Sequence, residues 1–212
     1  MRLPGDDLLP RAQAQRTMAR NLSASPAAVW PWIVQMGQER AGFYTYAALE
    51  NLAGCRITNA HEVRPQWQDV RVGDPVHLHP EVALQVAALE PPRAFVLGTE
   101  ACVDLDERAA GTGPGESGDR ADRGDRADSG DRADGGARAD RNARGPAFDF
   151  TWAFVLEPAV GGSRLLVRER YDCPSGAALA AVRAMRPVSG FMTHGTLRGI
   201  DRRSRGAAGP TG

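Results

Sequence analysis

The side chains best placed to do chemistry lie on a strand predicted over residues 164–172. Alternation along this segment places Glu169 and Tyr171 on one face with the aliphatic residues Leu165 and Val167, and arginines mainly on the other face. Because arginines favour water, the face that holds Glu169 should point inward. Burying a carboxylate among apolar side chains is costly unless it has partners. Glu169 is therefore the candidate catalytic residue and a candidate polar anchor that orients a ligand hydroxyl. In the alternative interpretation it pairs with an arginine or tyrosine near the end of the sheet, or a bulge turns it outward.

Other chemical sites are weakly indicated. His77 and His79 share one face of a predicted strand and could hold a metal, but no third ligand lies nearby, so we expect no metal and no cofactor. His194 lies on the flank of the last predicted helix, and Glu50 is a further acid or base candidate. The sequence has no GxSxG, HExxH, GxGxxG or phosphate-loop pattern, so acyl transfer by a serine triad is not expected.

The charge balance excludes several classes of function. The 212 residues include 26 basic and 26 acidic side chains, and every basic residue is arginine. A net charge of zero does not favour a nucleic-acid binder, which needs surplus cations. The absence of lysine excludes Schiff-base chemistry and the phosphate-loop lysine.

Cysteine usage and hydropathy predict a soluble cytoplasmic protein. Cys55, Cys102 and Cys173 are odd in number and far apart, which is typical of reduced, buried thiols. The first residues contain no apolar stretch like that of a secretory signal, and no window approaches the roughly 20 apolar residues of a membrane span.

One segment differs sharply in composition from the rest of the chain. Residues 117–146 follow a degenerate six-residue repeat (SGDRAD, RGDRAD, SGDRAD, GGARAD) without any valine, isoleucine, leucine, methionine or aromatic residue. Such a segment cannot offset the entropy of ordering its backbone. We expect a disordered insertion at about 106–146 within one domain over 16–203, preceded by a lead-in, 1–15, and followed by a disordered tail, 204–212.

The elements that would position the candidate residues follow from periodicity. A stripe of apolar residues after Ser25 and Pro26 predicts a short helix that ends near Gly37, and a second short helix is predicted over 44–53. The final segment, 176–203, is predicted to be a long helix with a kink or a break at Pro187. Its expected inner face holds Val182, Met185, Val188, Met192, Thr196 and Gly199. Strands are predicted over 16–22, 75–79, 82–89, 94–99, 148–156 and 164–172.

Six blocks occur in an order that resembles one family. They are AAVWPWIVQMG (27–37), GFYTYAALENL (42–52), PQWQDVRVGD (65–74), FDFTWAFVLEP (148–158), RLLVRERY (164–171) and LRGI (197–200). The chain resembles a bacterial branch of the START-like, SRPBCC or polyketide-cyclase superfamily. This resemblance implies an α+β helix-grip fold, in which about seven antiparallel strands wrap around a long C-terminal helix and enclose an apolar cavity. The family's functions are diverse, so the resemblance implies no particular reaction.

The leading hypothesis is a binding or carrier protein for a hydrophobic small molecule, such as a lipid or a polyketide-like compound. The expected lining residues are Trp152, Phe154, Val167, Glu169, Tyr171, Met185 and Met192, with Tyr44 and Trp67 nearer the mouth. For each of them ordinary core packing is the alternative. One rival is a cyclase or dehydratase that uses Glu169, Tyr171 or Glu50. The other is a co-chaperone-like interaction domain, which would need an exposed groove. The sequence leaves the oligomeric state open.

Overall fold

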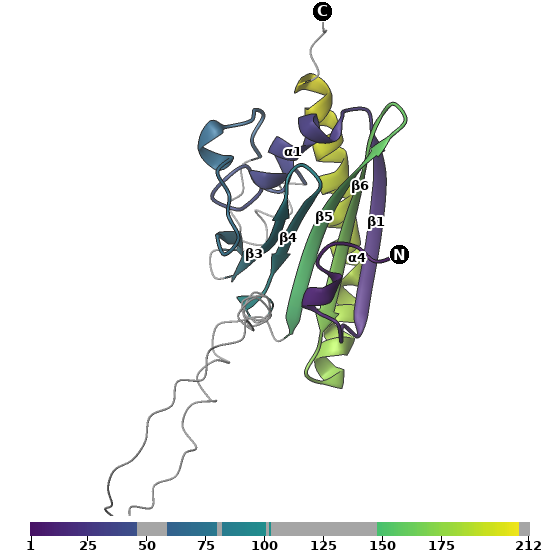
Figure 1. Ribbon diagram of the computed structural model, residues 1–212. Coiled ribbons are helices and arrows are strands. Elements are labelled where there is room, and N and C mark those ends of the chain that lie inside the picture. Colours follow the sequence, from purple (N-terminus) through teal and green to yellow (C-terminus); the bar gives the residue numbers. More distant parts are fainter. Residues whose placement is uncertain (46–58, 80–81, 101, 103–147, 208–212) are drawn as a thin grey trace, which may run out of the picture.

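Six antiparallel strands form one curved sheet in the order β1-β6-β5-β4-β3-β2, with a long helix, α4, along its inner face (Figure 1). The computed structural model describes residues 1–45, 59–79, 82–100, 102 and 148–207. The helices are α1 (Pro26–Val34) and α4 (Gly176–Ala207), with 3-10 turns at Asp6–Leu8 and Pro65–Trp67. The strands are β1 (Ala14–Leu22), β2 (Pro75–His79), β3 (Val82–Glu90), β4 (Ala94–Gly98), β5 (Asp149–Ala159) and β6 (Gly162–Asp172). This architecture confirms the expected α+β helix-grip fold.

The β5–β6 hairpin joins the two longest strands of the sheet and has the most regular alternation in the chain. Its inner face carries the pairs Phe154–Val167 and Trp152–Glu169, which lie directly opposite each other. The turn needs glycine at residue 162, where φ is 153° and an added Cβ would lie 2.1 Å from the backbone oxygen of Leu22.

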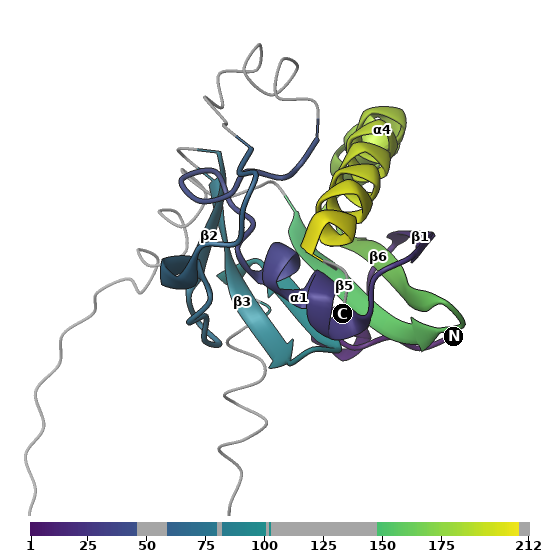
Figure 2. The same cartoon turned by 90° about the horizontal axis from the view of Figure 1, so that it is seen from above.

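Helix α1 fills one end of the space between the sheet and α4 (Figure 2). Pro26 occupies its first turn, as predicted, and Val29, Trp32 and Ile33 face the core. The second predicted helix, 44–53, lies outside the described residues except at Tyr44 and Thr45. Tyr44 has a left-handed φ of 58°, which is not helical.

Helix α4 runs for 32 residues and continues through Pro187, so a break does not occur there. The residues from Arg183 to Val188 are all exposed. The carbonyl of Arg183, which lacks a donor because Pro187 has no N–H, can therefore reach water.

The predicted inner face of α4 is correct at Val182, Thr196 and Gly199, which are buried, and wrong at two residues. Met185 is 57% exposed and Val188 is 54% exposed, so the expectation that they face the sheet is wrong. The inward stripe also contains Ser189, Thr193, Leu197 and Ile200, which were not predicted to face inward. Small and hydroxyl side chains on α4 allow the helix to lie close to β1 and β6. The pattern of larger apolar residues in the sequence does not predict that these small side chains face inward.

The outer face of the sheet is covered by the N-terminal residues. Leu3 packs on Val155 and Leu166. Arg168 was expected in water, but it is only 6% exposed, because Asp6 covers it with a contact of 2.6 Å between Nη1 and Oδ2. None of the described helices is long and apolar enough to cross a membrane.

Candidate functional site at the inner face of the sheet

Glu169 is held beneath α4 by three hydroxyl groups. Its carboxylate accepts hydrogen bonds from Tyr171 (3.1 Å), Ser189 (2.6 Å) and Thr193 (2.8 Å), and the residue is 6% exposed. A carboxylate offers about four lone-pair positions, so at least one acceptor position remains. Among the described residues no cation forms an ion pair with Glu169. We call Glu169, Tyr171, Ser189 and Thr193 the Glu169 cluster.

Trp152 lies beside this cluster and has an unused donor. It is the cross-strand partner of Glu169 on β5, and its ring packs on Phe154 (4.7 Å between centroids) and on Phe43 (6.0 Å). Its indole Nε1 is enclosed and has no hydrogen-bond partner. An enclosed N–H without an acceptor is unfavourable, so this position suits an oxygen atom from a ligand.

Tyr171 supplies an aromatic wall and a hydroxyl donor. Its ring lies 4.7 Å from that of Phe150 and 5.4 Å from that of Phe148. Burial raises the pKa of Tyr171, and the negative charge of Glu169 raises it further. The hydroxyl therefore keeps its proton at neutral pH and remains a donor to the carboxylate.

Arg16 closes the cluster on the side of β1. It is the other cross-strand neighbour of Glu169, and its guanidinium occupies the position that a side chain at Gly190 would take. Because residue 190 is glycine, α4 can lie close to β1 with the flat guanidinium of Arg16 between them.

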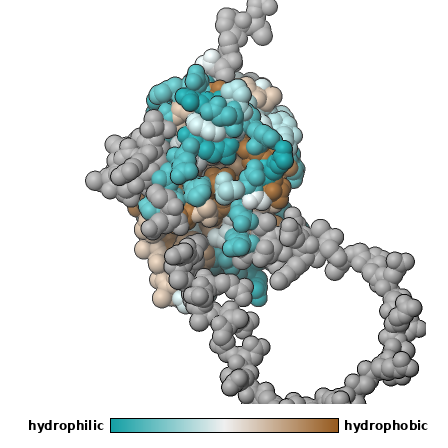
Figure 3. All heavy atoms as spheres, turned by 90° about the vertical axis from the view of Figure 1, so that its left-hand side faces the viewer, coloured by the Kyte–Doolittle hydropathy of each residue, from teal (hydrophilic) through white to brown (hydrophobic). Residues whose placement is uncertain are grey.

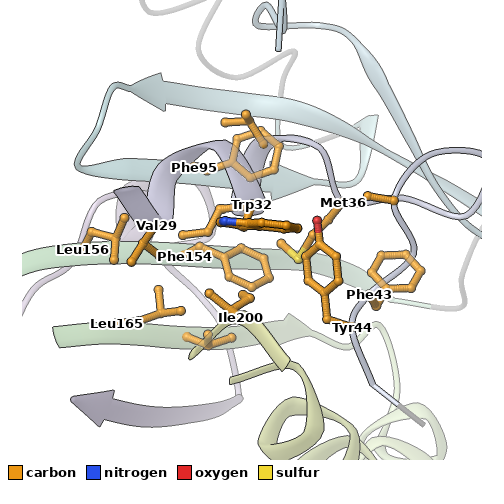
Figure 4. Packing of buried hydrophobic residues seen from close by; sticks show 14 of the residues in the cluster. Val29, Trp32, Met36, Phe43, Tyr44, Phe95, Phe154, Leu156, Leu165 and Ile200 are labelled. Atoms are coloured by element: carbon orange, nitrogen blue, oxygen red, sulfur yellow. The ribbon is translucent and has the colours of Figure 1, made fainter. Parts of the chain in front are cut away.

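The opposite end of the inner face is filled with side chains. Figure 4 shows Trp32, Phe154, Leu165 and Ile200 packed together, and all four are almost completely buried. Phe150, Trp152, Tyr171 and Met192 are only partly buried. Accessible aromatic surface on the inner face is therefore concentrated around Glu169.

The remaining residues predicted to line a ligand site are dispersed. Phe154, Val167 and Tyr44 belong to the packed core, and the Tyr44 hydroxyl accepts a hydrogen bond of 2.8 Å from Gln35. Trp67 is partly buried beneath the guanidinium of Arg64, 5.3 Å from it. Met185 is exposed on α4, away from the inner face.

Sequence reasoning missed the two helix hydroxyls that hold Glu169. Ser189 and Thr193 are four residues apart on α4, the spacing that places two side chains on one helical face. That hydroxyl pair was the available signal, but the apolar stripe through Met185 and Val188 masked it. Glu50 lies outside the described residues.

The described residues hold no group of three side chains that could bind a metal. His77 is partly buried, with its Nδ1 enclosed and unpartnered, whereas His79 has a partner of its own.

Comparisons with known proteins identify neighbours only at the level of solved structures. No known family description matches the sequence, and no curated protein matches it. One similar structure is a protein from Nitrosomonas europaea, 8% identical over 91% of this chain and 94% of that one, with a TM-score of 0.44. The di-domain ARO/CYC StfQ of the steffimycin biosynthetic pathway is 10% identical over 92% of this chain and 52% of that one (TM-score 0.43). The AHSA1 protein from Silicibacter pomeroyi is 16% identical over 89% of this chain and 96% of that one (TM-score 0.38). The fold assignment rests on the strand order and the long helix, and these likenesses carry no argument about activity.

Proposed function

We propose that the protein binds a hydrophobic small molecule with one polar oxygen, of lipid or polyketide type, between the sheet and the first half of α4. The observation that carries this proposal is the adjacency of Glu169, which has an acceptor position left, and Trp152, which has an unpartnered donor. A ligand hydroxyl can donate to the carboxylate and accept from the indole at the same time.

The surroundings favour an apolar ligand body. Phe150, Trp152 and Tyr171 present partly buried rings beside Glu169, and Met192 is a partly buried residue of α4. Burying apolar ligand surface against these rings is favourable by about 25 cal/mol per Å². The carboxylate would fix the orientation of the ligand, and the rings would supply most of its affinity.

A matched pair of probes tests the polar anchor. Equilibrium dialysis would measure Kd for 1-naphthol and for 1-methylnaphthalene, which differ mainly by a hydroxyl and a methyl group. Since a hydrogen bond to a charged acceptor is worth about 1 kcal/mol more than one to a neutral acceptor, Glu169→Gln should reduce the preference for 1-naphthol about fivefold. The control is Glu157→Gln, which changes a glutamate on the opposite face of the neighbouring strand.

Equal preferences in the wild-type protein and in Glu169→Gln would show that Glu169 is structural. Failure of both probes to bind would contradict the proposal altogether.

A cyclase or dehydratase would use the same residues, but it requires conversion of a bound polyketide-like substrate. Binding without conversion supports the carrier.

A further inference from the structure

Five arginines gather around the last turns of α4. Arg198, Arg202, Arg203 and Arg205 belong to the helix, and Arg20 reaches it from β1. We call these five residues the arginine cluster. In Figure 3, hydrophilic surface covers the top of the molecule, toward which this end of α4 points in Figure 1. A chain without net charge thus concentrates positive charge at one place.

One carboxylate within the arginine cluster already pairs with two arginines. Asp201 is buried and accepts from Arg20 at 3.0 and 3.1 Å and from Arg205 at 2.8 and 3.0 Å. A single negative charge therefore faces two guanidinium groups. The three-residue group of Arg20, Asp201 and Arg205 keeps a net positive charge.

Arg203 has a structural role. Its guanidinium lies 4.7 Å above the ring of Tyr44 and donates to the backbone oxygens of Ala60 (2.8 Å) and Gly199 (3.2 Å). Burial lowers the pKa of Arg203, the negative form of Tyr44 would raise it, and the charge of Arg202 lowers it further. Arg203 is thus anchored and adds fixed positive charge.

Arg198 and Arg202 are exposed and have no ion-pair or hydrogen-bond partner among the described residues. They are four residues apart, so they lie on one face of α4. Both line two adjoining hollows. The first, of about 290 Å³, also contacts Tyr44, Thr45, Gly195, Gly199 and Arg203. The second, of about 180 Å³, also contacts Arg20, Asp201 and Arg205.

We propose that these hollows form a binding site for a phosphate monoester group, held by Arg198 and Arg202. Guanidinium groups bind phosphate oxygens in a fork geometry, and a monoester carries a charge of about −1.5 to −2 at neutral pH. The first hollow is smaller than most sites for drug-sized ligands, so it suits a compact charged group. Gly195 and Gly199 line the first hollow with backbone alone.

This site is separate from the one proposed for a hydrophobic ligand. Thr193 of the Glu169 cluster precedes Arg198 by five residues and Arg202 by nine, which is roughly 8 and 13 Å along the helix. Neither site shares a side chain with the other. The failure of one proposal therefore leaves the other standing.

The test is an NMR titration of the full chain at low ionic strength with glycerol 3-phosphate, with glycerol as the uncharged control. We expect saturable shifts of the amides of Gly195 and Gly199 with the phosphate ester alone. Arg202→Gln and Arg198→Gln should each weaken binding about tenfold. Arg183→Gln removes the same charge from an exposed position near the other end of α4 and should leave Kd unchanged. Added salt should weaken binding because the site is open to solvent.

A parallel arm uses vesicles that contain phosphatidic acid, whose head group is also a phosphate monoester. If Arg202→Gln abolishes vesicle binding and glycerol 3-phosphate competes with it, the bound phosphate monoester belongs to a lipid head group. Binding of glycerol 3-phosphate without vesicle binding identifies a soluble ester. Three results would each overturn the proposal. One is that Arg183→Gln weakens phosphate binding as much as Arg202→Gln does. The others are a response only to an acidic peptide and the lack of a saturable response to either phosphate probe.

Discussion

At the scale of single residues, Arg168 is a buried cation with one carboxylate partner, Asp6, and two neutral acceptors, Thr17 and the backbone oxygen of Met1. Asp6 lies 2.6 Å from its guanidinium, and both side chains are almost completely buried. Removing one member of a buried pair leaves an uncompensated charge, so we expect Asp6→Asn to lower the free energy of unfolding by about 3 kcal/mol. Urea denaturation measures this change. Asp7→Asn, at an exposed neighbour, is the control and should cost little. Equal effects would show that the pair is not a determinant of stability.

Two buried tyrosines link stability to alkaline pH. Burial raises the pKa of both Tyr44 and Tyr171 above the unfolded value of about 10. Between the unfolded and the folded pKa, the folded chain keeps protons that the unfolded chain releases. The stability from these residues is thus present below pH about 10 and is lost as the pH rises above it. Urea denaturation between pH 9 and 11 should show this fall, and Tyr171→Phe should make it shallower. An unchanged slope in that variant would exclude Tyr171 as a cause.

Alternation predicted the inward orientation of Glu169, but its partners could not be predicted. Arg168 and Arg170 lie on one face of this strand, and the period of two places Glu169 on the other face. Ser189 and Thr193 come from a helix whose rotation depends on how closely two backbones approach. Arg168 was assigned to water because the packing of the N-terminal residues behind the sheet has no periodic signal.

At the scale of elements, the close contact between α4 and the chain at Tyr44 depends on glycine at position 199. A Cβ there would lie 2.1 Å from the backbone oxygen of Tyr44, which cannot move aside cheaply. Alanine is favoured over glycine in a helix by about 1 kcal/mol. We nevertheless expect Gly199→Ala to lower the melting temperature. Gly206→Ala, on the same helix with open space around it, should raise it or leave it unchanged. The same sign in both variants would contradict the packing described for α4.

The strands from β2 to β6 were predictable because each pairs with the next strand in sequence, whereas the pairing of β1 with β6 has no such local signal. The hairpin of β5 and β6 extends only a few residues beyond the predicted ranges, since the turn at Gly161 and Gly162 fixes its register. Helix α4 was predicted with the correct start, and its predicted inner face is right at Val182 and Thr196 but wrong at Met185 and Val188. The disruptive effect of Pro187 on α4 was overestimated, because the tertiary structure decides whether its helical turn is open to water.

At the scale of the whole molecule, we expect residues 111–146 to be dispensable for folding. The segment contains no large apolar side chain, and shortening a loop changes the closure entropy by only a few tenths to about 1 kcal/mol. A variant without this segment should keep a cooperative thermal transition at nearly the same temperature. Loss of the cooperative transition would show that the repeat packs against the domain.

The central claim, a ligand held between Glu169 and Trp152, is tested most directly by the indole N–H signals of the four tryptophans. The ¹H–¹⁵N spectrum of the full chain would be recorded during a titration with 1-naphthol, and Trp152→Phe would assign the Trp152 signal. The structure predicts a saturable downfield shift of this signal, because its N–H gains an acceptor, and slower exchange of its proton with water. The shift should disappear with 1-methylnaphthalene and shrink in Glu169→Gln. A Trp152 signal that stays unchanged while 1-naphthol binds would contradict the proposed site.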